Sequence, residues 1–169
     1  MIVMMFEGNG GFMNNTERLM RLSQALGFEA LDIVEIFELG HIEMREEEVE
    51  KLLLGQNTSP FEYETLEAFL NGLIVFNRGE SPLKPGQTER KPMTVEDPRS
   101  INNVMLKKMK IAFSLSSEDM LDLFKEVEIS ISKDKLSSLF RKEGHKSYKY
   151  CRDVYVVGFL KALGQRSMM

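Results

Sequence analysis

Cys151, His145 and Asp153 are the side chains of this sequence that could supply a nucleophile, a base and a group that orients the base. A thiol nucleophile needs a base within hydrogen-bonding reach and a third group that holds the base in place. Closeness in the sequence does not supply that geometry, and a single cysteine is often a buried core residue. We therefore expect Cys151 to fill core space and His145 to lie in a surface loop, and we predict no catalytic residue.

Metal and cofactor chemistry finds little support in the sequence. His41 and His145 are far apart and would need carboxylates from distant positions to hold a metal ion. The acidic residues of the segment 46–50 suit the first turn of a helix, where they complement the helix dipole. The sequence contains no phosphate loop, dinucleotide-binding glycine motif, HExxH motif or nucleophile elbow. We predict neither a cofactor nor a metal site.

A basic helix and the loop after it carry the strongest surface signal. The helix is expected to contain Leu136, Leu139 and Phe140. If these three residues face the core, positions 133, 137 and 141 lie in a line on the outer face. Cationic side chains can contact phosphates, aromatic rings can stack on unpaired bases, and two short helices fit a helix-turn-helix. A basic helix that improves solubility or docks on an acidic protein would look the same. The candidate nucleic-acid-binding residues are Lys133, Ser137, Arg141, Lys142, His145, Lys146, Tyr148, Lys149 and Arg152.

The elements that would position these residues form a repeat. Aligning Asn15 with Asn102 places Leu19 on Leu106, Ala25 on Ala112, Asp32 on Asp119 and Phe37 on Phe124. Most other apolar positions of the first copy align with apolar positions of the second. The chain is therefore expected to contain two copies of one helical unit.

Apolar residues at helical spacing predict four helices in each copy. The expected fold is all-α, with two tandem four-helix units, residues 13–78 and 101–169. Residues 79–100 hold four of the five prolines and are expected to form a linker, because proline breaks helices and central strands. Residues 1–12 are expected to be a flexible leader. Whether the two units pack together is left open.

The copies differ in charge. Residues 13–79 contain 5 Lys or Arg and 13 Asp or Glu, whereas residues 101–169 contain 13 Lys or Arg and 8 Asp or Glu. The net charge of the whole chain is −4. An acidic first unit and a basic second unit should attract each other, within one chain or between chains. This asymmetry predicts self-association through the two units, or an unknown protein partner.

The composition limits the class of protein. A single cysteine excludes an internal disulfide bond, and no apolar run approaches the roughly 20 residues that a membrane-spanning helix needs. A cytoplasmic protein with no membrane partner is predicted.

Three phrases of the sequence resemble the bacterial YehS-type family, which is described as a duplicated domain of unknown function. They are Met13-Asn-Asn, Phe69-Leu-Asn-Gly-Leu73 and Ser138-Leu-Phe-Arg-Lys-Glu-Gly-His-Lys-Ser-Tyr148, and the resemblance covers nearly everything after Met13. The leader and an apparent shortening after Tyr63 depart from the family pattern. The resemblance implies a duplicated helical fold and a cytoplasmic bacterial protein, and it carries over no catalytic residue.

Taken together, these patterns favour a non-enzymatic interaction or regulatory module. The alternative is DNA or RNA binding through the basic, helix-turn-helix-like second unit. An enzyme ranks third.

Overall fold

The computed structural model describes residues 13–56, 59–80, 85–86 and 94–167. The regular structure of these residues is entirely helical, which confirms the predicted all-α class. The predicted leader, residues 1–12, and residues 81–84 and 87–93 of the predicted linker lie outside the described residues. None of the helices in the described ranges is long and apolar enough to cross a membrane.

Each copy contains four α-helices, as predicted, and we call the copies repeat 1 and repeat 2. Repeat 1 consists of α1 (Asn15–Leu26), α2 (Ala30–Leu39), α3 (Glu46–Leu53) and α4 (Tyr63–Arg78). A short 3-10 turn, η1 (Pro98–Ser100), leads into repeat 2. Repeat 2 consists of α5 (Ile101–Ala112), α6 (Ser117–Glu126), α7 (Lys133–Phe140) and α8 (Asp153–Ser167).

Local capping signals set several of these boundaries. Gly27 ends α1 in the left-handed conformation, at a φ of 68°, which glycine adopts without steric cost. Ser116 begins α6 with a capping box: its hydroxyl accepts from the Asp119 N–H at 3.1 Å, and the Asp119 carboxylate accepts from the Ser116 N–H at 2.8 Å. Both ends are therefore set by residues within one turn of the helix terminus.

Equivalent phenylalanines occupy the cores of the two repeats. Phe37 on α2 and Phe124 on α6 are both fully buried. Phe37 packs against Phe69 on α4 with ring centroids 4.9 Å apart, and Phe124 packs against Phe159 on α8 at 6.0 Å. The predicted equivalence of Phe37 and Phe124 is therefore seen in burial and in partner.

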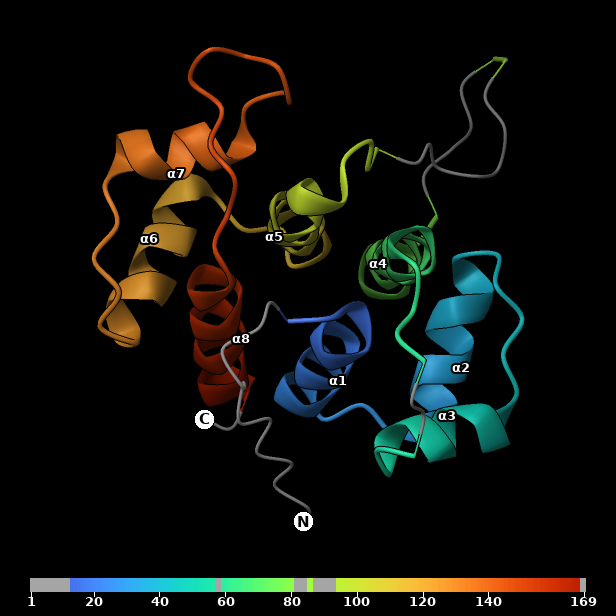
Figure 1. Ribbon diagram of the computed structural model, residues 1–169. Coiled ribbons are helices and arrows are strands. Elements are labelled where there is room, and N and C mark those ends of the chain that lie inside the picture. Colours follow the sequence, from blue (N-terminus) through green and yellow to red (C-terminus); the bar gives the residue numbers. More distant parts are fainter. Residues whose placement is uncertain (1–12, 57–58, 81–84, 87–93, 168–169) are drawn as a thin grey trace.

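The two repeats are interlocked rather than merely adjacent (Figure 1). The first helix of each repeat packs against the last helix of the other, so α1 lies on α8 and α5 lies on α4. The two interfaces are equivalent to each other, which gives the molecule an approximate two-fold symmetry. α2 and α3 form one flank of the molecule, and α6 and α7 form the opposite flank.

A matching pair of hydrogen bonds fixes the start of α4 and of α8. In repeat 1, the Asn15 amide donates to the Phe61 carbonyl at 3.0 Å, and the Phe61 N–H donates to the Thr16 hydroxyl at 3.1 Å. In repeat 2 the corresponding bonds, of 3.0 and 2.9 Å, are made by Asn102, Asn103 and Cys151. Polar side chains on the first helix of each repeat thus hold the backbone just before its last helix.

A buried carboxylate ties the linker to both repeats. Glu67 on α4 is fully buried and accepts hydrogen bonds from the N–H and hydroxyl of Thr94 and from the N–H of Val95. Lys108 on α5 lies 3.4 Å away, and its ammonium also donates to Asn71 at 2.7 Å. Burial lowers the pKa of Lys108, and the charge of Glu67 opposes that shift. This ion pair crosses the α4–α5 interface.

Candidate functional site

The predicted binding residues after α7 lie on one segment, Arg141–Arg152, which we call the basic segment. It joins α7 to α8 and is anchored by the buried side chain of Asn103 on α5. The Asn103 amide donates to the Leu139 carbonyl at 3.0 Å and to the Lys149 carbonyl at 2.8 Å, and its oxygen accepts from the Cys151 N–H. The two ends of the basic segment are therefore held at defined positions.

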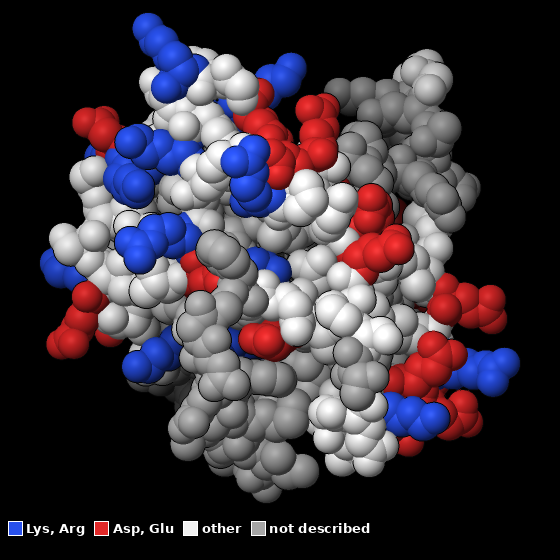
Figure 2. All heavy atoms as spheres, in the orientation of Figure 1, with Lys and Arg blue, Asp and Glu red and all other residues white. Residues whose placement is uncertain are grey.

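The cationic side chains of the basic segment are exposed. Within the described ranges, none of them forms an ion pair with a carboxylate. Glu143 is the sole acidic residue of the segment. Figure 2 shows the resulting contrast, with Lys and Arg gathered over the repeat 2 side and Asp and Glu over the flank of α2 and α3. The unpaired cations are Arg141, Lys142, Lys146, Lys149 and Arg152.

The two other predicted members of the segment differ in exposure. His145 is exposed, and its Nδ1 accepts from the Ser147 N–H at 3.0 Å. Tyr148 is half-buried, and burial of its hydroxyl raises the pKa of this group to about 12. Its ring meets that of Tyr150 edge-on at 5.3 Å, and the Arg99 guanidinium lies 4.9 Å from the Tyr150 ring centroid. Tyr148 is thus part of the wall that supports the segment.

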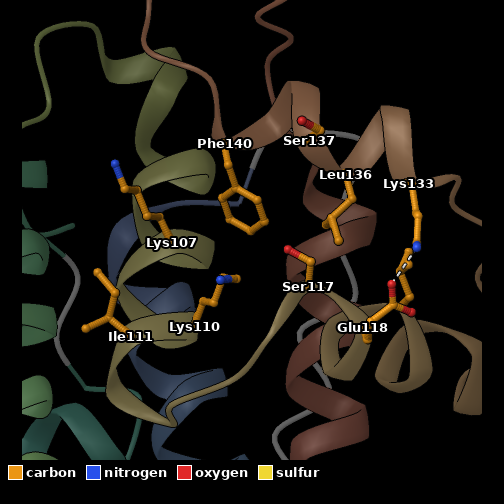
Figure 3. Close-up of a pocket in the computed structure, with 10 residues that line it drawn as sticks. Lys107, Lys110, Ile111, Ser117, Glu118, Lys133, Leu136, Ser137 and Phe140 are labelled. Atoms are coloured by element: carbon orange, nitrogen blue, oxygen red, sulfur yellow. Dashed lines mark ion pairs between the residues drawn. The ribbon is translucent and has the colours of Figure 1, made fainter.

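The predicted residues on α7 face a groove between α5, α6 and α7 (Figure 3). Lys133 is exposed, but its ammonium pairs with the Glu118 carboxylate at 2.6 Å, which raises the pKa of Lys133. Ser137 is exposed on the same groove wall. The structure therefore separates these two residues from the unpaired cations of the basic segment.

The groove itself has a volume of about 450 Å³ and an apolar floor with a basic rim. Leu136 and Phe140 contribute to the floor, and Lys107 and Lys110 on α5 to the rim. The Lys110 ammonium lies 5.9 Å from the centroid of the Phe140 ring. This surface suits an apolar side chain with acidic neighbours.

The nucleophile, base and orienting group considered in the sequence are not brought together. Cys151 is 4% exposed, burial raises the pKa of its thiol to about 12, and its Sγ donates to the Arg152 carbonyl at 3.6 Å. The Asp153 carboxylate binds other partners. Buried Cys151 and exposed His145 both match the structural expectation. Across the described ranges, no group of three His, Cys, Asp or Glu could hold a metal ion.

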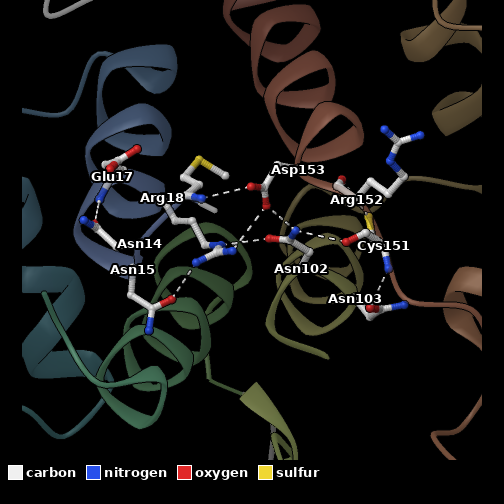
Figure 4. A network of polar contacts seen from close by, with 10 residues as sticks. Asn14, Asn15, Glu17, Arg18, Asn102, Asn103, Cys151, Arg152 and Asp153 are labelled. Carbon is white, nitrogen blue, oxygen red and sulfur yellow. Dashed lines mark hydrogen bonds and ion pairs between the residues drawn. The ribbon is translucent and has the colours of Figure 1, made fainter. Parts of the chain in front are cut away.

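A polar network joins α1 to α5 and α8 across the two repeats (Figure 4). The Arg18 guanidinium donates to Asn102 at 2.8 Å, to Asn15 at 3.0 Å and to Asp153 at 3.3 Å. Asp153 also accepts from the Asn102 amide at 2.7 Å and from the Met13 N–H at 2.9 Å. Burial lowers the pKa of Arg18 despite the neighbouring charge of Asp153.

Beside this network lies a second concavity, of about 680 Å³, which we call the central cavity. It is lined by the starts of α1, α4, α5 and α8 and by the end of the basic segment. Phe61, Tyr63, Ile101 and Val154 contribute apolar surface to its wall. This site could not be predicted from the sequence, because the residues that form it come from four separate places in the chain. Asn15 and Asn102, which the repeat alignment places together and which both line this cavity, were the available signal.

The fold and these surfaces define a class of protein: an interlocked, duplicated all-α protein. Residues 14–79 and 102–167 each match the family described as "Protein of unknown function (DUF1456)". The chain belongs to this family. It is also 32% identical over 138 residues to "Uncharacterized protein YehS" of Escherichia coli strain K12, covering 80% of this chain and 84% of that protein. No solved structure matches. These findings confirm the family resemblance that the sequence showed.

Proposed function

We propose that this chain is a non-enzymatic nucleic-acid-binding protein that holds a single strand on the basic segment of repeat 2. The observation that carries the proposal is the set of five exposed cations on Arg141–Arg152 that have no carboxylate partner in the described residues. Cations that are not neutralised internally are available to phosphates, and release of counterions then favours binding.

The anchoring of the segment supports the same proposal. Asn103 fixes the backbone at Lys149 and Cys151, so the cations project from a fixed support. A positively charged track that follows a nucleic-acid backbone is the usual basis of sequence-tolerant single-strand binding.

Reading of duplex DNA by a helix-turn-helix is less well supported. The candidate recognition helix α7 has eight residues, and its Lys133 is paired with Glu118. Lys133 and Ser137 line the groove shared with α5 and α6. A recognition helix needs a free face in the major groove, and the geometry of α7 gives little support for that role.

Fluorescence anisotropy with labelled single-stranded RNA, single-stranded DNA and duplex DNA tests the proposal on the full chain. The single strands should bind more tightly than the duplex, and their affinity should fall by orders of magnitude between about 50 and 200 mM salt. The full chain is the correct reagent because α5 and α8 pack against helices of repeat 1.

A charge-reversal pair locates the site. Lys142→Glu with Lys146→Glu should weaken binding on the order of tenfold or more, since both cations lie on the segment. Lys125→Glu with Lys161→Glu makes the same change in net charge at exposed positions of α6 and α8 and should have a much smaller effect. Equal losses in both variants would mean that net charge, rather than the basic segment, governs binding.

One observation favours a second function, the docking of an acidic segment of a partner protein, which includes the acidic repeat 1 of another copy. It is the apolar floor and lysine rim of the groove in Figure 3. Amphipathic helices bind such grooves through regularly spaced apolar anchors. An acidic amphipathic peptide should then bind the wild type and lose affinity for Lys107→Glu with Lys110→Glu, while Lys142→Glu with Lys146→Glu binds it normally.

A further inference from the structure

The central cavity and the basic segment share residues. Tyr150, Cys151 and Arg152 are the last three residues of the segment and also line the cavity. A strand whose phosphates follow the segment is therefore delivered to the mouth of the cavity. This continuity is a property of the chain path and does not depend on any single side-chain contact.

The volume and lining of the central cavity suit a ring-shaped ligand. Its volume of about 680 Å³ lies within the range of roughly 300–1,000 Å³ that is typical of small-molecule sites. Phe61 and Tyr63 place aromatic rings in the wall, and Val154 on α8 lies at its exposed edge with 51% of its surface accessible. Apolar and aromatic walls favour a flat heterocycle over a hydrated ion.

The charges beside the cavity also favour a neutral group inside it. The buried Arg18 is already matched by the Asp153 carboxylate and by two Asn side chains (Figure 4). Arg152, in contrast, is exposed and has no carboxylate partner in the part of the chain that the structure describes. The charge of Arg18 inside the cavity is thus balanced by Asp153, whereas the rim of the cavity carries the positive charge of Arg152. That distribution fits a neutral base inside and a phosphate outside.

A hydrogen-bonding group is also available at the cavity. The Asn14 side-chain oxygen caps α1 by accepting from the Glu17 N–H at 2.8 Å. The amide NH₂ of Asn14 donates to no acceptor among the described residues, and Asn14 is exposed on the cavity wall. An amide donor beside aromatic walls is the combination that proteins use to hold an unstacked base.

We infer that the central cavity takes one unstacked nucleobase of a single strand bound along the basic segment. This inference rests on the proposed function and adds to it a site for one base, formed by both repeats. It explains how a protein without a free recognition helix would prefer a single strand, because a base inside a duplex cannot enter the cavity without leaving its stack.

The test compares a short single strand with the same strand in which stable abasic residues replace the bases. The wild-type chain should bind the normal strand roughly tenfold more tightly, because one stacked base is lost in the abasic strand. A strand that carries 2-aminopurine should change its emission on binding. Both measurements use the wild type and need no variant.

Val154→Trp places a large ring at the edge of the cavity. It should abolish the roughly tenfold preference and the 2-aminopurine response, while the salt-dependent binding of the abasic strand persists. Leu31→Trp is the matched control, since Leu31 is 63% exposed on α2 and lies away from the cavity lining. It should behave as the wild type does.

The outcomes separate the two claims. If the wild type binds normal and abasic strands equally tightly, the base site is overturned and the proposed function stands. A preference that survives Val154→Trp also overturns the site. Failure to bind any strand at about 50 mM salt overturns the proposed function and the base site together.

Discussion

The α1–α8 and α4–α5 interfaces are equivalent by the repeat, yet they carry their charges differently. Arg18 on α1 pairs with Asp153 on α8, whereas Lys108 on α5 pairs with Glu67 on α4. In the repeat alignment, Lys108 corresponds to Arg21 rather than to Arg18, so the ion pair lies about one helical turn further along the α4–α5 interface. The apolar positions and the backbone-holding hydrogen bonds were retained in both. Packing constrains such an interface at many positions, whereas a charge pair can be relocated.

The same two interfaces show how opposite charges are distributed between the repeats. The acidic and basic character of the two repeats suggested that opposite charges would draw them together. Within the chain, one ion pair has its acid on repeat 1 and the other has its acid on repeat 2. The acidic flank of α2 and α3 and the basic segment lie on opposite sides of the molecule. Self-association between chains through these surfaces stays a prediction.

Replacing the carboxylate residue of each interface by alanine should lower the free energy of unfolding by unequal amounts. Glu67→Ala leaves the Lys108 charge buried and two backbone N–H groups without acceptors, so we expect a loss of about 3–5 kcal/mol in the free energy of unfolding. Asp153→Ala should cost only about 1–3 kcal/mol, because the Asp153 side chain is 29% exposed and water can reach the site. Urea denaturation of both variants measures the difference. Equal costs would show that the two interfaces are energetically alike despite their different burial.

The close approach of α2 to α4 distinguishes the repeats at a second place. A Cβ atom on Gly72 of α4 would meet the Ile36 carbonyl oxygen of α2, which is backbone and cannot move aside easily. The last helices align with three extra residues in repeat 2, so that Phe69 falls on Phe159, and the equivalent position in repeat 2 is Ala162 on α8. We expect Gly72→Ala to cost about 3 kcal/mol or more through overpacking.

Ala162→Gly is the matched variant and should cost about 1–2 kcal/mol, through helix propensity and the loss of a buried methyl group. Thermal and urea denaturation measure both changes. A Gly72→Ala protein as stable as the wild type would mean that α2 and α4 can separate without loss.

The stability of repeat 2 should depend on pH through Cys151, whereas its counterpart in repeat 1, Phe61, does not titrate. Burial raises the pKa of the Cys151 thiol from 9.0 to about 12, so the thiol is protonated in both states below pH 9. Between pH 9 and 12 the unfolded chain loses its thiol proton first, and folding stability therefore falls as pH rises. Cys151→Val should lack this loss, so the free energy of unfolding of the wild type minus that of the variant should decrease by roughly 1 kcal/mol between pH 7.5 and 10. A difference that is constant from pH 7.5 to 10 would contradict the raised pKa.

Much of the fold follows from the sequence because local signals determine it. The stripe of apolar residues, Gly27 and the Ser116 cap act within a few residues, and they set the helices and their ends. The number of helices and the equivalence of Phe37 and Phe124 followed from the repeat. The basic surface was visible as composition, and the exposed cations of Arg141–Arg152 appear in the structure.

The interlocked arrangement and the central cavity could not be read from the sequence in the same way. They depend on contacts between Arg18, Asn102 and Asp153, which are far apart in the chain, and no local rule pairs them. The ion pair of Lys133 with Glu118 was also missed, because it depends on the angle between α6 and α7. Periodicity identifies which faces of a helix are buried, but it does not identify the helix that covers each face.

The interlocking has a consequence for the order of folding. α4 and α5 are separated by the linker alone and can meet soon after both have been synthesised, whereas α1 is made first and its partner α8 is made last. Closing the longer loop costs roughly 1.5 kcal/mol more in chain entropy than closing the shorter one. On the ribosome, α1 can meet α3 and α4 early, but the part of its surface that packs on α8 stays exposed until α8 has emerged. Two interfaces that are equivalent in the finished molecule therefore form at different times.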